Sequence, residues 1–215
     1  MNWVWTIGAP LVRAIMSIVC RVRIEGVEHV PRTGAVIIAP NHVSVLDGPA
    51  VSAVVGTHRW RATRNLIAAE LFRGVTGWIL RQAHQVPIRR GSGDTGALDE
   101  AIDAVRAGSC VGIFPEGRVS DAPRAGLQRI RSGLTRVATP TGAPVVPVGI
   151  WGTHHVWPKG GLDRGALRRR HTIAIVIGQA LQAHPDEPPG EFRERYRAAL
   201  EAVVSRARTM TGDPA

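Results

Sequence analysis

The chain has 215 residues, 44% of them hydrophobic, and a formal net charge of +10 at pH 7. This length suits one α/β-sized domain with terminal additions, and the ordinary composition excludes low-complexity tracts and a long disordered linker. The positive charge indicates an anionic partner: nucleic acid, acidic lipid or a phosphorylated substrate. Almost all of this charge is arginine, since Lys159 is the only lysine, so coding bias is an alternative cause of the skew.

The first 24 residues are largely apolar. Arg13 interrupts them before they reach the roughly 18 to 20 apolar residues of a membrane span, and the basic leader and cleavage site of a signal peptide are missing. Pro10 suits the first turn of a helix. Arg13, Ser17 and Arg21 then recur every four residues, which predicts one polar stripe on an otherwise apolar helix.

Two interpretations of this helix stay open. Trp3 and Trp5 precede it, and tryptophan favours the membrane interface, so residues 1–24 would form an interfacial segment on an anionic bilayer, with arginines reaching the headgroups. That interpretation predicts a peripheral, monotopic protein on the cytoplasmic face of the cell membrane. The alternative is a core helix that packs on the domain.

Apolar, β-branched segments and helical patterns alternate along the rest of the chain. The predicted strands are residues 34–40, 64–69, 84–88, 110–114, 143–150 and 172–178. The predicted helices are residues 94–108, 132–142 and 188–209, the last one ending near Gly212. Continuously apolar strands that alternate with helices predict an α/β fold with a mainly parallel central sheet flanked by helices. Cys20 and Cys110 lie far apart in apolar segments and are expected to be buried thiols in a reducing compartment.

The segment "PNHVSVLDG" follows the first of these strands. A spacing of five does not place His42 and Asp47 on one helix face, but a turn after the strand lets Asp47, in the first helical residues, reach back to one ring nitrogen. The other nitrogen can then take a proton from an alcohol. No Gly-x-Ser-x-Gly nucleophile motif occurs, so this base would activate the substrate's own hydroxyl. The alternative is a buried structural hydrogen bond.

Two further polar segments follow strands, at the edge of the sheet where ligands of parallel sheets bind. In "FPEGRVS", Gly117 lets the backbone approach a ligand closely, and Glu116 is expected to accept a substrate hydroxyl or to brace an arginine. In "PIRRG", Arg89 and Arg90 meet the start of a helix, a combination that suits an anion. Solvated turns are the alternative for both segments.

Together these segments resemble the glycerophosphate and lysophosphatidic acid acyltransferases, the PlsC-like family. Asn41-His42 followed by Asp47 resembles the first block of that family, and "FPEGRVS" resembles its Phe-Pro-Glu-Gly-Thr-Arg-Ser block. "PIRR" is similar to its Phe-Ile-x-Arg block, and "VPV" at residues 146–148 resembles its fourth block. The four blocks occur in the family's order over residues 41–148.

The resemblance implies transfer of a fatty acyl group from acyl-CoA or acyl-carrier protein to a glycerophosphate or lysophospholipid hydroxyl, without a cofactor or a metal. It implies that His42 is the general base, that Asp47 orients it and that Arg90 contacts phosphate. The other expected substrate-binding residues are Arg89, Glu116, Gly117, Arg118 and Pro147. The acyltransferase domain is expected over residues 25–210, followed by a flexible tail over 211–215.

The sequence departs from the family pattern in two blocks. Arg118 stands where the family has threonine, Val119 where it has arginine, and Pro87 replaces phenylalanine. A shift of one residue in a turn redirects a side chain, so the phosphate role of Arg118 is an open question.

Other classes of function compete with this interpretation. The segment "GSGDTG", residues 91–96, is a formal dinucleotide-binding pattern, with Glu116 about 20 residues later, and would fit an NAD-dependent oxidoreductase. A basic nucleic-acid-binding or membrane-binding module is a further alternative, but no recognised nucleic-acid motif occurs, and no nucleic-acid partner is expected. His154 and His155 are adjacent, so they are expected to point in different directions, without an acidic residue at ligand spacing and without a metal.

Overall fold

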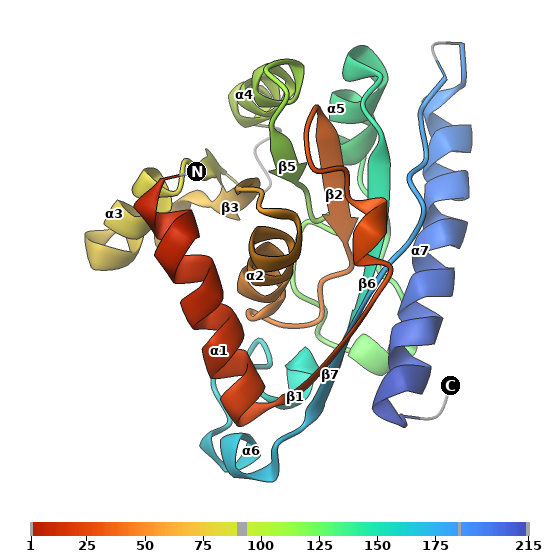
Figure 1. Cartoon of the computed structure of the whole chain (residues 1–215). Coiled ribbons are helices and arrows are strands. Elements are labelled where there is room, and N and C mark those ends of the chain that lie inside the picture. Colours follow the sequence, from red (N-terminus) through yellow and green to blue (C-terminus); the bar gives the residue numbers. More distant parts are fainter. Residues whose placement is uncertain (1, 90–93, 185, 214–215) are drawn as a thin grey trace.

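The computed structural model describes residues 2–89, 94–184 and 186–213, and their centre is a seven-stranded sheet in the order β1-β7-β6-β2-β5-β3-β4 (Figure 1). Its strands are β1 (Arg21–Glu25), β2 (Val36–Pro40), β3 (Thr63–Ala68), β4 (Val86–Ile88), β5 (Cys110–Gly112), β6 (Val145–Trp151) and β7 (Thr172–Ile177). Every neighbouring pair is parallel except β6 and β7, which are antiparallel. The predicted α/β fold with a mainly parallel sheet is therefore confirmed.

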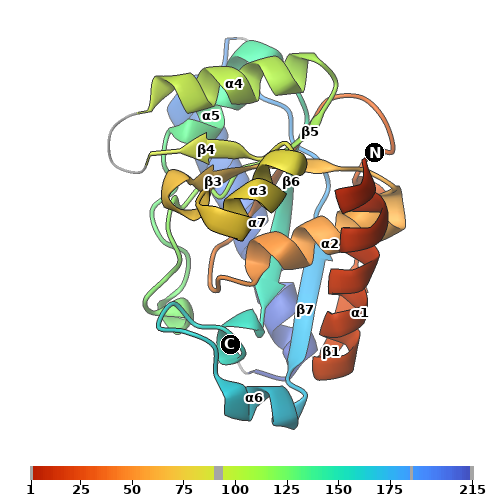
Figure 2. The same cartoon turned by 90° about the vertical axis from the view of Figure 1, so that its left-hand side faces the viewer.

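Helices cover both faces of this sheet. They are α1 (Ala9–Val19), α2 (Asp47–Arg59), α3 (Gly74–Gln82), α4 (Thr95–Arg106), α5 (Gly133–Thr141), α6 (Arg164–Arg169) and α7 (Pro189–Thr211). Helices α1 and α2 lie on one face, and α4, α5 and α7 lie on the other (Figures 1 and 2). Strand β2 shows why both faces need a cover: Ile37 and Ala39 pack towards α4, α5 and α7, whereas Val36 and Ile38 pack towards α2.

All six predicted strands and the three predicted helices of the domain are present, but β1 is an addition. The predicted N-terminal helix ends at Val19, because Cys20 adopts an extended conformation, and Arg21 begins β1. The polar stripe on α1 therefore consists of Arg13 and Ser17 without Arg21. Strand β1 pairs in parallel with β7 at the edge of the sheet. The predicted boundary after residue 24 thus falls inside a strand of the domain.

Helix α1 packs on the domain and also exposes apolar side chains. A π-helical turn, Val4–Gly8, precedes it. Ala9 packs closely against α2, because a Cβ added to Gly56 would lie 2.8 Å from the Cβ of Ala9. The opposite face of the segment carries side chains that are 49–71% exposed: Trp3, Ile7, Leu11, Ile15 and Ile18. Within the described residues, no helix combines the length and the hydropathy needed to cross a membrane.

Buried side chains connect the end of β2 to its neighbours. The Asn41 side chain donates to the carbonyl oxygen of Ile150 at 3.0 Å and accepts from the Ile150 N–H at 2.7 Å, which ties the chain after β2 to β6. From the other face, the hydroxyl of Tyr196 on α7 donates to the carbonyl oxygen of Ala39 at 2.7 Å. The backbone that leads into His42 is therefore held on both sides.

Both cysteines are buried as predicted, Cys20 beside α1 and Cys110 in β5. Burial raises the pKa of the Cys110 thiol to about 12 and also raises the pKa of the Cys20 thiol. Neither thiol is therefore a reactive nucleophile at neutral pH.

Candidate active site

His42 and Asp47 form a direct contact in the turn between β2 and α2. The turn lets the chain reverse after β2, and Asp47 is the first residue of α2. His42 Nδ1 lies 3.1 Å from Asp47 Oδ2, so the contact expected from the sequence is confirmed. Because the ionised carboxylate accepts from Nδ1–H, the lone pair of the imidazole is placed on Nε2.

The Asp47 carboxylate is fully buried and receives three further hydrogen bonds. Its Oδ2 accepts the backbone N–H groups of Val43 and Ser44, each at 2.7 Å. Its Oδ1 accepts the hydroxyl of Thr153, which follows β6, at 2.6 Å. The carboxylate is therefore held from two segments of the chain, and the direction from which it meets His42 is set by the fold.

The His42 ring is enclosed on one side and accessible at one edge. It packs on Phe114, with ring centroids 4.1 Å apart, and its side chain is 11% exposed. Across the described part of the chain, Nδ1 has its partner in Asp47, and Nε2 makes no hydrogen bond. Nε2 is therefore the ring nitrogen that is left for an alcohol that approaches this edge.

Glu116 supports this turn through the backbone. Its Oε1 accepts the His42 N–H at 2.7 Å, and its Oε2 accepts the Gln128 N–H at 2.9 Å. Arg131 donates to the Glu116 carbonyl oxygen at 3.1 Å and not to the carboxylate, whose two oxygens accept backbone N–H groups. The buried carboxylate therefore joins the β2 turn to the loop that precedes α5.

Gly117 is required by the conformation of the turn after β5. Its φ of +72° lies in the left-handed region, which residues with a Cβ adopt at a cost. A Cβ at this position would also lie 2.8 Å from Cδ of Arg131, whose N–H donates to the carbonyl oxygen of Pro115 at 2.8 Å. Gly117 thus lets the Arg131 side chain approach the backbone of this turn, in which the Glu116 carboxylate accepts the His42 N–H.

The remaining predicted residues lie at different places in the fold. Arg118 is exposed, and its Nε donates to Gln128 at 3.0 Å. Arg89 is exposed at the end of β4, where its N–H donates to Asp94, the N-cap of α4, at 2.9 Å. Arg90 lies outside the described residues. Pro147 is buried within β6. The substrate-binding roles of these residues stay predictions.

A cavity of about 270 Å³ adjoins the His42 turn. It is lined by Val43, Ser120, Asp121, Pro123, His154, Pro158, Lys159 and Gly160. Two of these groups, Lys159 and Asp121, form an ion pair at 2.7 Å. Ser120 connects the cavity to the turn, because its N–H donates to the carbonyl oxygen of His42 at 2.8 Å. The cavity therefore lies against the backbone of the His42 turn, through Val43 and Ser120.

The dinucleotide interpretation meets an obstacle at its acidic residue. Residues 91–93 of "GSGDTG" lie outside the described residues, while Asp94 caps α4 by accepting the Ala97 N–H at 3.2 Å. The carboxylate that this pattern would offer to a ribose is Glu116, and both of its oxygens accept backbone N–H groups. The geometry therefore favours a site centred on His42.

The chain belongs to the acyltransferase family, whose model matches residues 21–151. This span contains His42, Asp47, Glu116 and Pro147, and the predicted resemblance to the PlsC-like family is confirmed.

The similar proteins point to the same family. The crystal structure of the 1-acyl-sn-glycerophosphate (LPA) acyltransferase PlsC from Thermotoga maritima superposes with a TM-score of 0.78 at 26% identity, covering 94% of this chain and 79% of that one. The 1-acyl-sn-glycerol-3-phosphate acyltransferase of Bacillus subtilis is 26% identical over 94% of both chains. The chloroplastic enzyme BAT2 of Brassica napus is 27% identical over 84% of this chain and 51% of its own length.

Uncharacterized proteins of Mycobacterium tuberculosis and Mycobacterium bovis are 31% identical over 69% of this chain. The chain spans 42% of the length of these relatives.

Thr153→Val tests the support of the buried carboxylate. The substitution keeps the β-branched shape and removes the hydroxyl that donates to Asp47 Oδ1. We expect the free energy of unfolding to fall by about 1.5–3 kcal/mol, because one oxygen of a buried ionised group loses its donor. Urea denaturation measures the loss. Thr153→Ser keeps the hydroxyl and should lose markedly less, and equal losses in both variants would contradict this account.

Proposed function

We propose that this chain is an O-acyltransferase of the 1-acylglycerol-3-phosphate type. It moves a fatty acyl group from acyl-CoA or acyl-carrier protein to a glycerol hydroxyl of a glycerophosphate or lysophospholipid and so forms phosphatidic acid or a related phospholipid precursor. The observation that carries the proposal is the contact of His42 Nδ1 with the buried Asp47 carboxylate, which leaves Nε2 for a substrate hydroxyl. The names of the Bacillus and Thermotoga relatives support the choice of acceptor.

The proposed reaction needs no covalent enzyme intermediate. His42 Nε2 takes the proton of the acceptor hydroxyl as its oxygen attacks the thioester carbonyl carbon. The tetrahedral intermediate then collapses, the C–S bond breaks, and the imidazolium returns the proton to the departing thiolate. Asp47 keeps the proton on Nδ1 and stabilises the imidazolium that forms between the two steps. The products are an oxygen ester and a thiol.

The acceptor phosphate is assigned to arginines that follow β4 and β5 in the sequence. Arg90 follows β4 and carries the phosphate contact in this proposal, with Arg89 and Arg118 as further cations. The turn at Glu116 and Gly117 shapes the acceptor site next to His42. Pro147 is assigned to substrate binding from its position within β6, the strand that precedes Thr153.

The exposed face of α1 supports docking on an anionic membrane. Its apolar stripe continues to α3, because the rings of Trp3 and Trp78 lie with centroids 5.7 Å apart. Helix α3 and the turn before it expose Leu71, Val75 and Ile79 as well. Exposed apolar side chains on these two neighbouring helices suit the interface of a bilayer at the cytoplasmic face of the cell membrane. A lipid acceptor would then reach the site from the bilayer.

His42→Ala tests the base. We expect the kcat for thiol release from palmitoyl-CoA in the presence of lysophosphatidic acid to fall by about 10²–10⁴-fold, because the substrate hydroxyl loses its proton acceptor. A colorimetric thiol reagent measures the rate with and without the acceptor. His58→Ala removes an exposed histidine from α2 and should keep wild-type activity. Retention of most activity in the His42 variant would refute the assignment.

Arg90→Ala tests the acceptor site. We expect the KM for lysophosphatidic acid to rise by about 10- to 100-fold with kcat little changed, because one charge-assisted hydrogen bond to the phosphate is lost. Steady-state kinetics with varied acceptor separate the two constants. Arg106→Ala removes an exposed arginine from the last turn of α4 and serves as the control. A KM unchanged in the Arg90 variant but raised in Arg118→Ala would move the phosphate contact to Arg118.

The double substitution Leu11→Gln and Ile15→Gln tests membrane docking. It removes two exposed apolar side chains from α1 without changing its charge. We expect binding to vesicles of phosphatidylcholine with phosphatidylglycerol to fall at least tenfold, since buried apolar area contributes about 25 cal/mol per Å². Vesicle flotation measures the fraction of protein bound to these vesicles. Leu162→Gln alters an exposed leucine outside α1 and α3 and should leave binding intact. Equal binding by all variants would exclude α1 as the docking face.

A further inference from the structure

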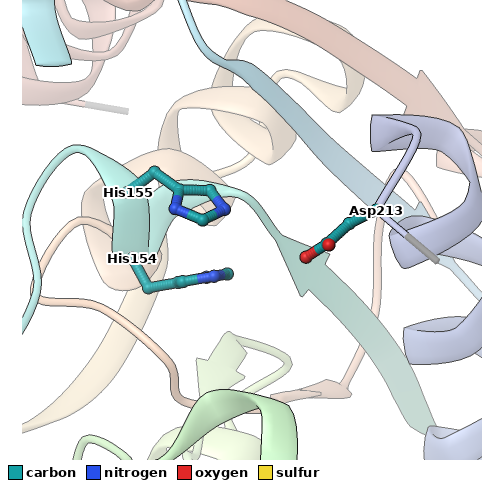
Figure 3. A group of neighbouring side chains, drawn as sticks. All are labelled: His154, His155 and Asp213. Atoms are coloured by element: carbon teal, nitrogen blue, oxygen red, sulfur yellow. The ribbon is translucent and has the colours of Figure 1, made fainter. Parts of the chain in front are cut away.

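The expectation that His154 and His155 point apart, without an acidic neighbour, is wrong. Both residues lie in the short 3₁₀ turn Thr153–His155 after β6, and their ring centroids are 4.1 Å apart. The end of α7 brings Asp213 to the same place, with its carboxylate directed towards the two rings (Figure 3). One potential ligand atom from each of the three residues lies within 4.8 Å of the others.

His154 is the unusual member of this cluster. Both of its ring nitrogens are shielded from solvent, and neither has a hydrogen-bond partner within the described part of the chain. A buried polar atom without a partner costs about 1–3 kcal/mol, so such atoms point to an unfilled role. Stacking against His155 and the edge of Trp151 does not provide a partner for a nitrogen lone pair.

Burial or a neighbouring group lowers the pKa of each member of the cluster. Burial, followed by the neighbouring His155, lowers the pKa of His154 to about 4. Burial and the nearby His171 lower the pKa of His155 as well. The hydrogen bond from the Trp151 indole keeps the pKa of Asp213 below its usual value.

We propose that His154, His155 and Asp213 form a binding site for a divalent transition metal of the zinc class. Two imidazoles and one carboxylate make a typical zinc ligand set with a position left for water, and they disfavour magnesium and calcium, which prefer oxygen ligands. Tetrahedral ligand atoms about 2 Å from zinc lie roughly 3.3 Å apart, so small side-chain rotations complete the site. Trp151 Nε1, 2.9 Å from Asp213 Oδ2, orients the carboxylate.

Two arginines oppose the ion. Arg124 pairs with Asp213 Oδ1 at 3.1 Å, and the guanidinium of Arg208 lies 5.0 Å from the centre of the Trp151 ring. The Arg124 side chain is 65% exposed, so its ion pair contributes little and the side chain can move into solvent when a metal binds. The positive charge of the two arginines weakens the binding of every cation, so only an ion with a high affinity for imidazole nitrogen would bind here.

A metal ion at this site would connect two segments that are far apart in the sequence. It would link Asp213, two residues beyond the end of α7, to the turn after β6, where Thr153 donates to Asp47. His154 also lines the cavity beside the His42 turn. A bound metal would thus brace the segment that supports the buried carboxylate, without contact to His42.

Zinc and cobalt titrations of the tag-free, chelator-treated full chain test the site. We expect about one Zn²⁺ per chain by calorimetry, a visible Co²⁺ absorption band typical of low coordination, and a rise in Tm with Zn²⁺ but not with Mg²⁺. His155→Gln and Asp213→Asn should each weaken Zn²⁺ binding at least tenfold. Circular dichroism establishes that these partly exposed substitutions leave the fold intact.

Arg124→Gln is the matched control, because it breaks the same ion pair as Asp213→Asn but keeps the three ligands. It should bind Zn²⁺ at least as tightly as the wild type. A loss as large as that of Asp213→Asn would mean that the variants act by loosening the end of the chain, and would overturn the assignment. Absence of binding, or equal binding by the wild type and Asp213→Asn, would also overturn it. None of these measurements depends on acyl transfer.

Discussion

The buried carboxylate of Asp47 is the constraint on which the rest of the site depends. An ionised group without solvent contact is tolerated only when its oxygens are supplied with donors, and here they receive an imidazole, two backbone N–H groups and a hydroxyl. These donors come from the turn after β2 and from the segment after β6. The cost of leaving any of them unpaired holds the two segments together and keeps His42 in one orientation.

Glu116 supplies a second buried carboxylate whose two oxygens accept hydrogen bonds from different segments of the chain. Glu116 joins the His42 backbone to Gln128, so the turn after β5 is attached to the turn after β2. The left-handed conformation of Gly117 makes that attachment possible. Parallel strands explain why such contacts arise, because their carboxyl ends lie at one edge of the sheet and their loops meet there. The geometry around His42 is thus a property of three loops and not of one motif.

The N-terminal helix has one face packed on the domain and one exposed apolar face. The two interpretations of its sequence, a core helix and an interfacial helix, are compatible in the structure, since one face packs on α2 and the other is exposed. The exposed face meets α3 through Trp3 and Trp78, so the apolar surface is made by segments that are far apart in the sequence. Because the domain itself carries this surface, docking would hold the whole sheet at a defined orientation to the bilayer.

The sequence by itself determined the local features: the strands and helices of the domain, which follow from apolar periodicity, and the pairing of His42 with Asp47, which needs only one turn. It also indicated the family, because the blocks are short and ordered.

Only the tertiary structure decided which distant groups complete the site. Thr153 lies 106 positions from Asp47, Glu116 lies 74 positions from His42, and Asp213 meets His154 only because α7 returns along β6. The edge strand β1 was missed because Arg21 continues the four-residue spacing of Arg13 and Ser17, although Arg21–Glu25 alternates charged and apolar residues as a strand does, and its pairing with β7 depends on the order of strands in the sheet. Periodicity and turns are properties of neighbouring residues, whereas strand order and loop meeting points are set by how the whole chain packs.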